Sequence, residues 1–370
     1  MKERVLVAMS GGVDSSVAAY LLKEEGYEII GATIKTWSSG ECRDERAKGC
    51  CSLRDVDDAR SVAAKLGIPY YVLDLSEEFK EKVIDNFVET YLEAKTPHPC
   101  IRCNNDIKFG AFLKKAEELG AARVATGHYA RKVRDKESGR WTIAEAGDPT
   151  KDQSYVLFGL TAAQIEKTLL PVGDYPKTEI RAIARKLGLR VSDKPDSQEI
   201  CFVSSHYAEF ITRQGVALPG RGPILDREGR VVGEHEGYHL FTIGQRKGMG
   251  LTHPTPYYVI AVDRVRNAVI VGEESDLYKK AISVKNTNWI LPPRAGKTYA
   301  AKIRSRHAKA PGTLTDFSPE GDARFEFEAP EKSPAPGQAA VFYDGDKIAG
   351  GGWIEEAFAG APSPAHSASL

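Results

Sequence analysis

Residues 5–16 read VLVAMSGGVDSS, and the fold of the chain is decided in this stretch. Its apolar start is typical of a short strand that is buried on both faces. Ser10, Gly11 and Gly12 follow with a hydroxyl and two positions that lack a Cβ, so backbone amides can close around a phosphate. Apolar residues at three- and four-residue spacing then predict a helix: Val17, Ala18, Leu21 and Leu22. The stretch predicts a strand, an anion-binding turn and a helix.

The string SGGVDSS at 10–16 resembles the phosphate loop of ATP-pyrophosphatases, which cleave ATP between its α and β phosphates. The stretch lacks the GxxxxGK(S/T) pattern of the other common phosphate loop. The resemblance implies ATP with Mg²⁺ and an adenylation rather than a γ-phosphoryl transfer. For Asp14 we weigh two roles, placing the metal or phosphates and capping the helix. The residues expected to contact ATP are Ala8, Met9, Ser10, Gly11, Gly12, Val13, Asp14, Ser15, Ile34 and Gly127.

Strands and helices alternate through the first half of the chain. Strands are predicted at 28–33, 70–73 and 123–126, and helices at 56–66, 77–91, 107–119 and 177–187. This alternation indicates an α/β fold with a doubly wound parallel sheet, whose strand ends gather their loops in one crevice. Gly127, His128 and Tyr129 follow one such strand and are expected near adenine and ribose. For His128 alone, a hydrogen-bonded structural role is the favoured interpretation.

The second half of the chain has a different character. After a short helix at 207–214 come β-branched runs separated by glycines, which are typical of small antiparallel barrels. We expect a catalytic domain at 1–206, a small central β domain at 207–279, a C-terminal β-barrel at 280–356 and a disordered tail at 357–370. In the barrel, strands are predicted at 299–305, 323–327 and 339–343.

Composition limits the function classes. The chain has 370 residues with 51 Lys plus Arg and 51 Asp plus Glu, so any surface for nucleic acid must be local. The sequence shows neither an apolar run of bilayer length nor a secretory leader, which predicts a cytoplasmic protein without a membrane partner. Six cysteines are too few for a disulfide scaffold. Cys42, Cys50 and Cys51 lie in or beside a polar stretch at 40–49, expected to be a mobile surface loop, and receive no role.

Residues 96–110 read TPHPCIRCNNDIKFG and place two thiols one turn apart, just before the predicted helix. A helix N-terminus nearby favours the thiolate form of a cysteine. Taken without context, a CxxC pair is compatible with a buried pair, half of a zinc site, or redox and sulfur chemistry.

Further motifs favour sulfur chemistry among these interpretations. KDQSY at 151–155, DSQEICF at 196–202, TIGQRKG at 242–248 and PGQAAVFY at 336–343 follow in order. Together with the phosphate loop and the CxxC pair, they resemble the tRNA-uridine 2-sulfurtransferases, or tRNA 2-thiouridylases, over residues 4–355. The resemblance implies ATP-dependent 2-thiolation of the wobble uridine, position 34, in the tRNAs for Lys, Glu and Gln. It also implies a sulfur-relay protein or cysteine desulfurase as donor.

The resemblance also implies roles for the cysteines. Cys103 matches the family's nucleophile, and Cys201 matches the cysteine that carries a persulfide. Many members have aspartate where this chain has Cys100. The three thiols Cys100, Cys103 and Cys201 resemble the set that holds a [4Fe–4S] cluster in related sulfurtransferases, so a cluster route and a persulfide and disulfide route both stay open.

Expected tRNA contacts lie in two places. Lys151, Asp152 and Gln153 match an element that contacts the substrate near the target base, and Arg304 and Ser305 match positions that meet tRNA. Lys302, Arg304 and Arg306 alternate with Ile303 and Ser305, which predicts three cations on one face of a strand. Arg246 and Lys247 are weaker candidates. Two alternatives remain: an ATP-pyrophosphatase that amidates or ligates a small molecule, and a non-catalytic tRNA-binding protein.

Overall fold

The computed structural model describes residues 2–36, 53–196, 200–203, 206–251, 256–318 and 321–360. The chain forms two compact units. The first comprises residues 1–85, 99–205 and 346–348, and the second comprises residues 86–98, 206–345 and 349–370. Among the described residues, no helix is both long enough and apolar enough to span a membrane.

A parallel sheet of five strands forms the centre of the first unit. Its strand order is β3-β2-β1-β4-β7, and each neighbouring pair is parallel. The strands are β1 (Arg4–Ala8), β2 (Glu28–Lys35), β3 (Tyr70–Asp74), β4 (Arg123–Ala125) and β7 (Thr168–Leu169). Because β1 lies inside the sheet and the order reverses between β1 and β4, the fold is doubly wound, as the sequence predicted.

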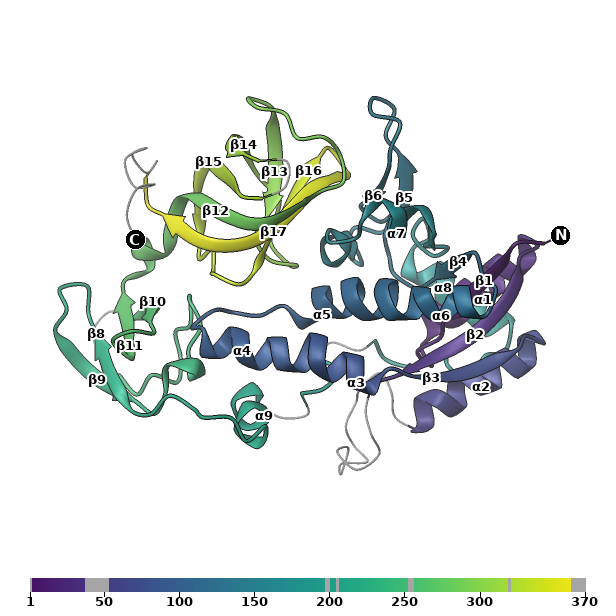
Figure 1. Ribbon diagram of the computed structural model, residues 1–370, viewed down its shortest axis with the longest axis horizontal. Helices are drawn as coiled ribbons and strands as arrows, with labels where there is room; N and C mark the ends of the chain where they lie inside the picture. The colour runs from purple at the N-terminus through teal and green to yellow at the C-terminus, as the bar shows by residue number, and fades with distance from the viewer. Residues whose placement is uncertain are drawn as a thin grey trace. The chain divides into compact units, whose positions relative to one another are not determined.

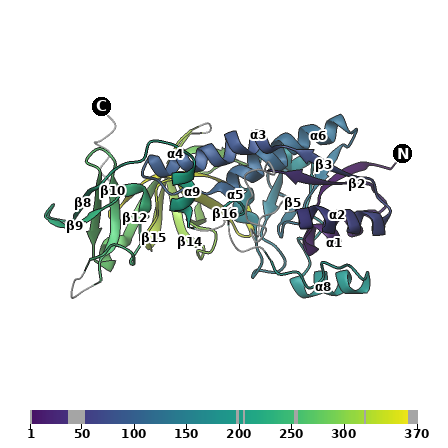
Figure 2. The same cartoon turned by 90° about the horizontal axis from the view of Figure 1, so that it is seen from below.

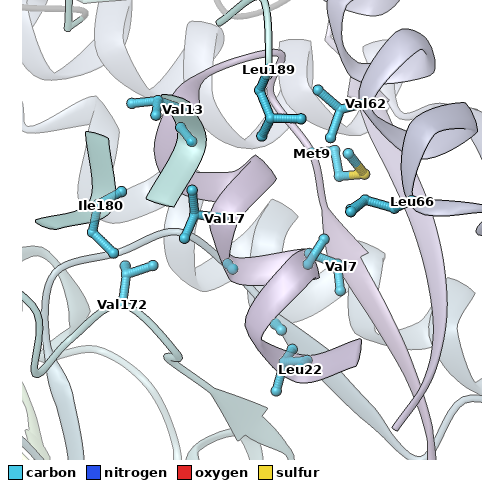
Figure 3. Packing of buried hydrophobic residues seen from close by; sticks show 14 of the residues in the cluster. Val7, Met9, Val13, Val17, Leu22, Val62, Leu66, Val172, Ile180 and Leu189 are labelled. Carbon is cyan, nitrogen blue, oxygen red and sulfur yellow. The ribbon is translucent and has the colours of Figure 1, made fainter. Parts of the chain in front are cut away.

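Helices cover both faces of this sheet. Figure 2 shows α6 (Phe112–Glu118) on one side and α1 (Val13–Glu24), α2 (Leu53–Leu66) and α8 (Lys177–Lys186) on the other. Figure 3 shows the core between β1 and the second group, where Val7, Val17 and Leu22 are at most 2% exposed. Val17 and Leu22 belong to the apolar spacing that predicted α1, so the pattern that predicts the helix also buries it.

The CxxC pair lies inside a helix, not just before one. The helix predicted at 107–119 begins at Pro99 and runs through α5 (Pro99–Arg102), the π-helical segment η2 (Cys103–Ala111) and α6. The predicted start at 107 was wrong, because proline is well accommodated in the first helical turn, where its missing N–H is not needed, and the helix begins at Pro99. Figure 1 shows α5 leading towards α6.

One long helix and several short elements complete this part of the chain. The helix predicted at 77–91 is confirmed as α3 (Ser76–Phe79), the π-helical segment η1 (Lys80–Asp85) and α4 (Asn86–Leu92), of which α4 belongs to the second unit. The remaining elements had no prediction: β5 (Arg131–Arg134), β6 (Trp141–Ala144), η3 (Ser154–Leu157) and α7 (Ala162–Glu166).

The second unit continues with a four-stranded sheet of order β10-β11-β8-β9. It contains α9 (Tyr207–Arg213), β8 (Gly222–Leu225), β9 (Val231–His235), η4 (Tyr238–Leu240), β10 (Tyr258–Asp263), β11 (Ala268–Gly272) and η5 (Glu274–Leu277). The expectation of a purely antiparallel arrangement was wrong, because β11 pairs with β8 in parallel. A long connection separates these two strands in sequence, which permits a parallel pair.

A closed six-stranded barrel completes the second unit. The strands are β12 (Tyr278–Trp289), β13 (Thr298–Lys302), β14 (Ala310–Phe317), β15 (Ala323–Lys332), β16 (Ala339–Asp344) and β17 (Lys347–Phe358). Their order is β12-β15-β14-β13-β16-β17, and pairing of β12 with β17 closes the barrel. Phe325, Phe327 and Phe342 fill its interior.

The predicted stripe of cations on strand 299–305 is wrong. β13 ends at Lys302, and the amide of His307 donates to the carbonyl of Arg304 at 3.1 Å, which closes a turn. The chain must reverse there because β14 pairs antiparallel with β13. Arg304, Ser305 and Arg306 are consecutive exposed residues of this turn and do not share a strand face.

Candidate active site

The phosphate loop joins β1 to α1 and is shaped by Gly11. Gly11 has a φ of +70°, a conformation that favours glycine. A Cβ at this position would lie 2.3 Å from the carbonyl oxygen of Asp55 in α2. Both backbone conformation and space therefore require glycine here.

Serine side chains fasten this loop to the first turn of α1. The Ser10 amide donates to Oγ of Ser15 at 3.2 Å, and the hydroxyl of Ser16 donates to the Gly12 carbonyl at 2.7 Å. Gly12 is the N-cap and has no side chain to cover the helix amides. The N–H groups at this helix start are consequently available to an anion.

Two neighbouring strands border the loop. A Cβ at Gly127, after β4, would lie 2.6 Å from the amide nitrogen of Ser15, so Gly127 packs directly on the start of α1. Ile34 lies in β2, two residues beyond Ala32, which is the register partner of Ala8. The fold therefore brings the expected ATP positions of β1, α1, β2 and β4 to the carboxyl edge of one sheet.

His128 has a structural environment in this edge. Its side chain is buried, and its Nδ1 lies 2.7 Å from the Thr126 hydroxyl. Burial lowers the pKa of the imidazole well below its ordinary value, with a smaller effect from Lys108. The neutral ring is therefore the form present at physiological pH.

Asp14 is the first carboxylate of the site. It lies in the first turn of α1, whereas the N-cap is Gly12, so the N-cap interpretation of Asp14 is wrong. Its carboxylate accepts hydrogen bonds from the Tyr129 hydroxyl at 2.7 Å and from Nζ of Lys177 at 2.7 Å. Burial, followed by the bond to Asp14, raises the pKa of Tyr129. Asp14 also supplies the kind of oxygen that Mg²⁺ binds.

Asp196 is the second carboxylate. Nζ of Lys177 lies 2.8 Å from one of its oxygens, Nζ of Lys151 lies 2.8 Å from the other, and Arg181 approaches to 3.1 Å. Burial raises the pKa of Asp196, but the bonds from Lys151 and Lys177 outweigh burial and lower it to about 2. Lys177 therefore connects the phosphate loop to the DSQEICF motif.

A second lysine holds the loop from the side of α2. Nζ of Lys194 donates to the Gly11 carbonyl at 2.9 Å, to Asp55 at 2.6 Å and to Asp58 at 2.7 Å. Burial alone would lower the pKa of Lys194, but its two carboxylate partners raise it. This lysine is cationic and ties α2 to the phosphate loop.

The expected tRNA contacts of the KDQ element have internal partners in this structure. Lys151 pairs with Asp196, and Asp152 accepts from the Ser154 amide at 3.1 Å. The side-chain oxygen Oε1 of Gln153 accepts a hydrogen bond from the Tyr129 amide at 2.9 Å. This element therefore supports Tyr129 and Asp196 beside the phosphate loop.

The three expected thiols lie in two segments of the first unit. Cys100 is exposed in α5, and Cys103 is half-buried at the start of η2. Cys201 is half-buried in a turn at 200–203, where the Val203 amide donates to the Ile200 carbonyl. The adjacent Phe202 packs edge-on against Phe79 of α3 at 5.8 Å between ring centroids. Because α3 also packs against η2, the Cys201 turn and the Cys103 helix share a neighbour.

The three thiols do not gather as a metal site. Across the described ranges, no group of three or more His, Cys, Asp and Glu side chains is close enough to hold a metal ion. The residues described therefore do not fit a [4Fe–4S] cluster as they stand. Cys42, Cys50, Cys51 and residues 197–199 lie outside the described residues.

Comparison with known proteins gives the family. Family models match residues 3–205 as a tRNA methyl transferase HUP domain, 208–273 as a PRC-barrel domain and 279–354 as an aminomethyltransferase β-barrel domain. A tRNA-specific 2-thiouridylase of Symbiobacterium thermophilum is 49% identical over 96% of this chain and 93% of its own. Its counterpart in Moorella thermoacetica is 50% identical over 95% of this chain and 99% of its own. The chain belongs to the tRNA-specific 2-thiouridylase family.

Several residues of the site in this 2-thiouridylase family member were not predicted from the sequence. Lys177 was treated only as the start of a helix, and the contacts of Lys194 and Tyr129 with the loop were not foreseen. One signal was available for Lys177. A lysine in the first turn of a helix is disfavoured by the helix dipole, so its presence after Pro176 indicates a carboxylate partner from elsewhere.

Arg304 and Ser305 lie in the second unit. Arg304 is exposed, and its Nη2 donates to the Lys332 carbonyl at 2.7 Å and the Ser333 carbonyl at 3.3 Å. These bonds fix the orientation of the Arg304 side chain, which remains exposed on the surface.

Proposed function

We propose that this protein uses ATP to replace the C2 oxygen of the wobble uridine, position 34, by sulfur in the tRNAs for Lys, Glu and Gln. The reaction is supported by proteins named tRNA-specific 2-thiouridylase, which are 48–50% identical to this chain over 95–96% of its length. The observation that carries the proposal is the phosphate loop in the same compact unit as the CxxC helix and the Cys201 turn. Methyl transfer, which the family-model descriptions name, requires neither a phosphate loop nor paired thiols.

The phosphate loop serves the first step. A uracil carbonyl oxygen is a poor leaving group, so O2 attacks the α-phosphorus of ATP, and the bond to the pyrophosphate breaks. The amides at the start of α1 stabilise the charge on the departing pyrophosphate. Mg²⁺ supplies charge neutralisation when bound, and Asp14 would hold it. The uridine oxygen is then part of a phosphate ester that can leave as AMP.

The thiols serve the second step. Cys201 receives a sulfur atom from a relay protein or cysteine desulfurase and carries it as a persulfide. The terminal sulfur forms a bond to C2, and AMP leaves with the original oxygen. The Cys103 thiolate attacks the Cys201 sulfur, which releases the transferred sulfur on the base and leaves a disulfide between the two cysteines. Two electrons from a thiol reductant restore both thiols.

A cluster route is the second candidate, and it would require Cys100, Cys103 and Cys201 to come together from the positions that they have in this structure. Cys100 provides the third thiol, at a position where the family resemblance implies aspartate. Anaerobically purified protein that contains iron and shows the visible absorbance of an iron–sulfur cluster would support this route. Colourless, iron-free protein that still thiolates tRNA with a persulfide donor would reject it, and activity of Cys100→Asp would point the same way.

We assign the tRNA contacts to the same residues that the family resemblance implied. Lys151, Asp152 and Gln153 would contact the RNA near the target base, and Arg304 and Ser305 would contact it from the barrel. The proposed domains are 1–206 for catalysis, 207–279 as a central β domain and 280–356 as the barrel that binds tRNA.

Mass spectrometry of tRNA nucleosides tests the function. Wild type, incubated with ATP, a sulfur source and unmodified tRNA, should form 2-thiouridine and release pyrophosphate only when tRNA is present. Cys103→Ala and Cys201→Ala should form none, whereas Arg185→Gln, on the exposed side of α8, should match wild type. Pyrophosphate release without tRNA would favour a small-molecule ligase. Binding of tRNA without any release would favour a non-catalytic binding protein.

A further inference from the structure

A chain of ion pairs runs from the phosphate loop to the segment that precedes Cys201. Nζ of Lys177 in α8 lies 2.7 Å from the carboxylate of Asp14, in the first turn of α1, and 2.8 Å from that of Asp196. Asp196 precedes Cys201 by five residues in the sequence. The lysine between them is only 10% exposed, so water screens these contacts weakly.

Lys177 is in an unfavourable place unless both carboxylates are present. It begins α8, where the helix dipole opposes a positive charge, and burial adds a cost of desolvation. Asp14 and Asp196 together offset these costs. Any change in the charge near Asp14 must therefore change how Lys177 is shared with Asp196.

The segment 192–196 has a second attachment to the same loop. Lys194 donates to the Gly11 carbonyl, as described above, and Arg181 of α8 donates to the Ser192 and Lys194 carbonyls at 2.7 and 3.0 Å. Residues 192–196 are thus tied to the phosphate loop through Lys194 and, by way of Asp196, through Lys177.

We propose that Lys177 is a positioning residue that transmits occupancy of the phosphate loop to the segment carrying Cys201. This inference rests on the proposed function, in which ATP phosphates enter beside Asp14. The triphosphate attracts Lys177, and Mg²⁺ competes with Lys177 for Asp14. Either event weakens the contact between Lys177 and Asp196, which leaves Asp196 to Lys151 and Arg181. The Cys201 segment then differs between the nucleotide-free and nucleotide-bound states.

The test follows alkylation of Cys201 by iodoacetamide, read by peptide mass spectrometry with and without Mg·ATP in the full chain. In wild type, Mg·ATP should change the rate at Cys201 by about fivefold or more, the usual size of coupling between sites. Lys177→Gln and Asp196→Asn should reduce this change to less than about twofold, and Lys177→Arg should retain part of it because the charge remains. ATP affinity, measured by calorimetry for each variant, shows that nucleotide still binds.

Arg185→Gln is the matched control. Arg185 is also a cation of α8 and contacts Asp193 of the same segment at 3.2 Å, but on the exposed side and away from the loop. This variant should respond to Mg·ATP as wild type does. A purely structural role for Lys177 would change stability and basal reactivity without removing the response to ATP.

Two results would overturn the inference: a wild-type Cys201 rate that Mg·ATP leaves unchanged, or a full response in Lys177→Gln and Asp196→Asn with ATP bound. Thiolation of tRNA by wild type is measured in parallel. Thiolation without any response of Cys201 contradicts the coupling alone. A response of Cys201 without thiolation contradicts the proposed function and leaves the coupling in place.

Discussion

Gly11 is the position where the phosphate loop is most sensitive to a side chain. Gly11→Ala should weaken ATP binding at least about tenfold and destabilise the protein by roughly 1–3 kcal/mol, because the new Cβ meets the Asp55 carbonyl and the backbone is left-handed. Calorimetry with ATP and thermal unfolding measure the two effects.

The variant Gly26→Ala is a control that separates the effect of backbone strain from the effect of the contact between the new Cβ and Asp55. Gly26 also has a positive φ, +94°, but nothing lies within 4 Å of a Cβ there. It should lose about 1 kcal/mol of stability from the backbone alone and bind ATP normally. Equal loss of ATP binding in both variants would contradict the role of the Asp55 contact.

Asp196 should make stability depend on pH in a defined window. Its pKa is lowered from 3.8 to about 2 in the folded protein, so the unfolded chain binds the proton more readily. Its contribution, about 2 kcal/mol, is present above about pH 4 and is lost as the pH falls through about 2. The difference in urea midpoint between wild type and Asp196→Asn should shrink over this range. A difference that persists unchanged at pH 2 would exclude these ion pairs as its source.

The helix that carries Cys103 depends on contacts that its own sequence does not reveal. A Cβ at Gly159 would lie 2.1 Å from the side-chain amide of Asn105 in η2. The side chain of Asn104, which is 1% exposed, donates to the Val156 carbonyl at 3.0 Å. Segment 156–159 therefore supports η2 immediately after Cys103.

Gly159→Ala should displace the half-buried Asn105 side chain and lower stability by roughly 1 kcal/mol, since the methyl group would occupy the place of the amide. The double variant Gly159→Ala with Asn105→Ala should recover part of this loss, because the colliding amide is gone. Thermal unfolding of the single and double variants gives the answer. Additive losses would show that the collision is not the cause.

Local sequence patterns were sufficient to predict the helices and strands that have a clear apolar period or a glycine at their end. Gly67 and Gly120 end helices with φ of +62° and +69°, as their positions after apolar helical patterns predicted. The start of the CxxC helix at Pro99 was missed because proline suits both an extended segment and the first turn of a helix. The end of β13 at Lys302 was missed because charged and apolar residues go on alternating after the last residue that pairs with β16.

The site was predictable where it is contiguous in sequence and not where it depends on distant partners. The phosphate loop is one uninterrupted string, so its residues could be named in advance. The contacts of Asp14 with Lys177 and of Gly11 with Lys194 join positions more than 160 residues apart. The place of Lys177 in the first turn of α8 indicates that it needs a carboxylate partner, but it does not show which carboxylates, and Lys194 lies outside any helix and carries no such signal.

The balanced charge of the whole chain decides how it should bind tRNA. With 51 cationic and 51 anionic side chains, long-range attraction to RNA is weak, and affinity must come from a small number of local phosphate contacts. Arg304 is one such contact in the proposed function, and Ser305 beside it carries no charge. Arg304→Ala should therefore reduce the slope of log Kd against log salt concentration by roughly 0.7–0.9.

Two controls complete this prediction. Ser305→Ala removes a neutral contact and should lower affinity without changing the slope. Arg266→Ala removes a cation that is 77% exposed in the central β domain and pairs with Asp263, outside the proposed contacts, and should change neither quantity. Filter binding of unmodified tRNA at several salt concentrations measures all three variants. If Arg304→Ala keeps the wild-type slope, Arg304 does not neutralise a phosphate, and the tRNA surface must be sought away from this turn.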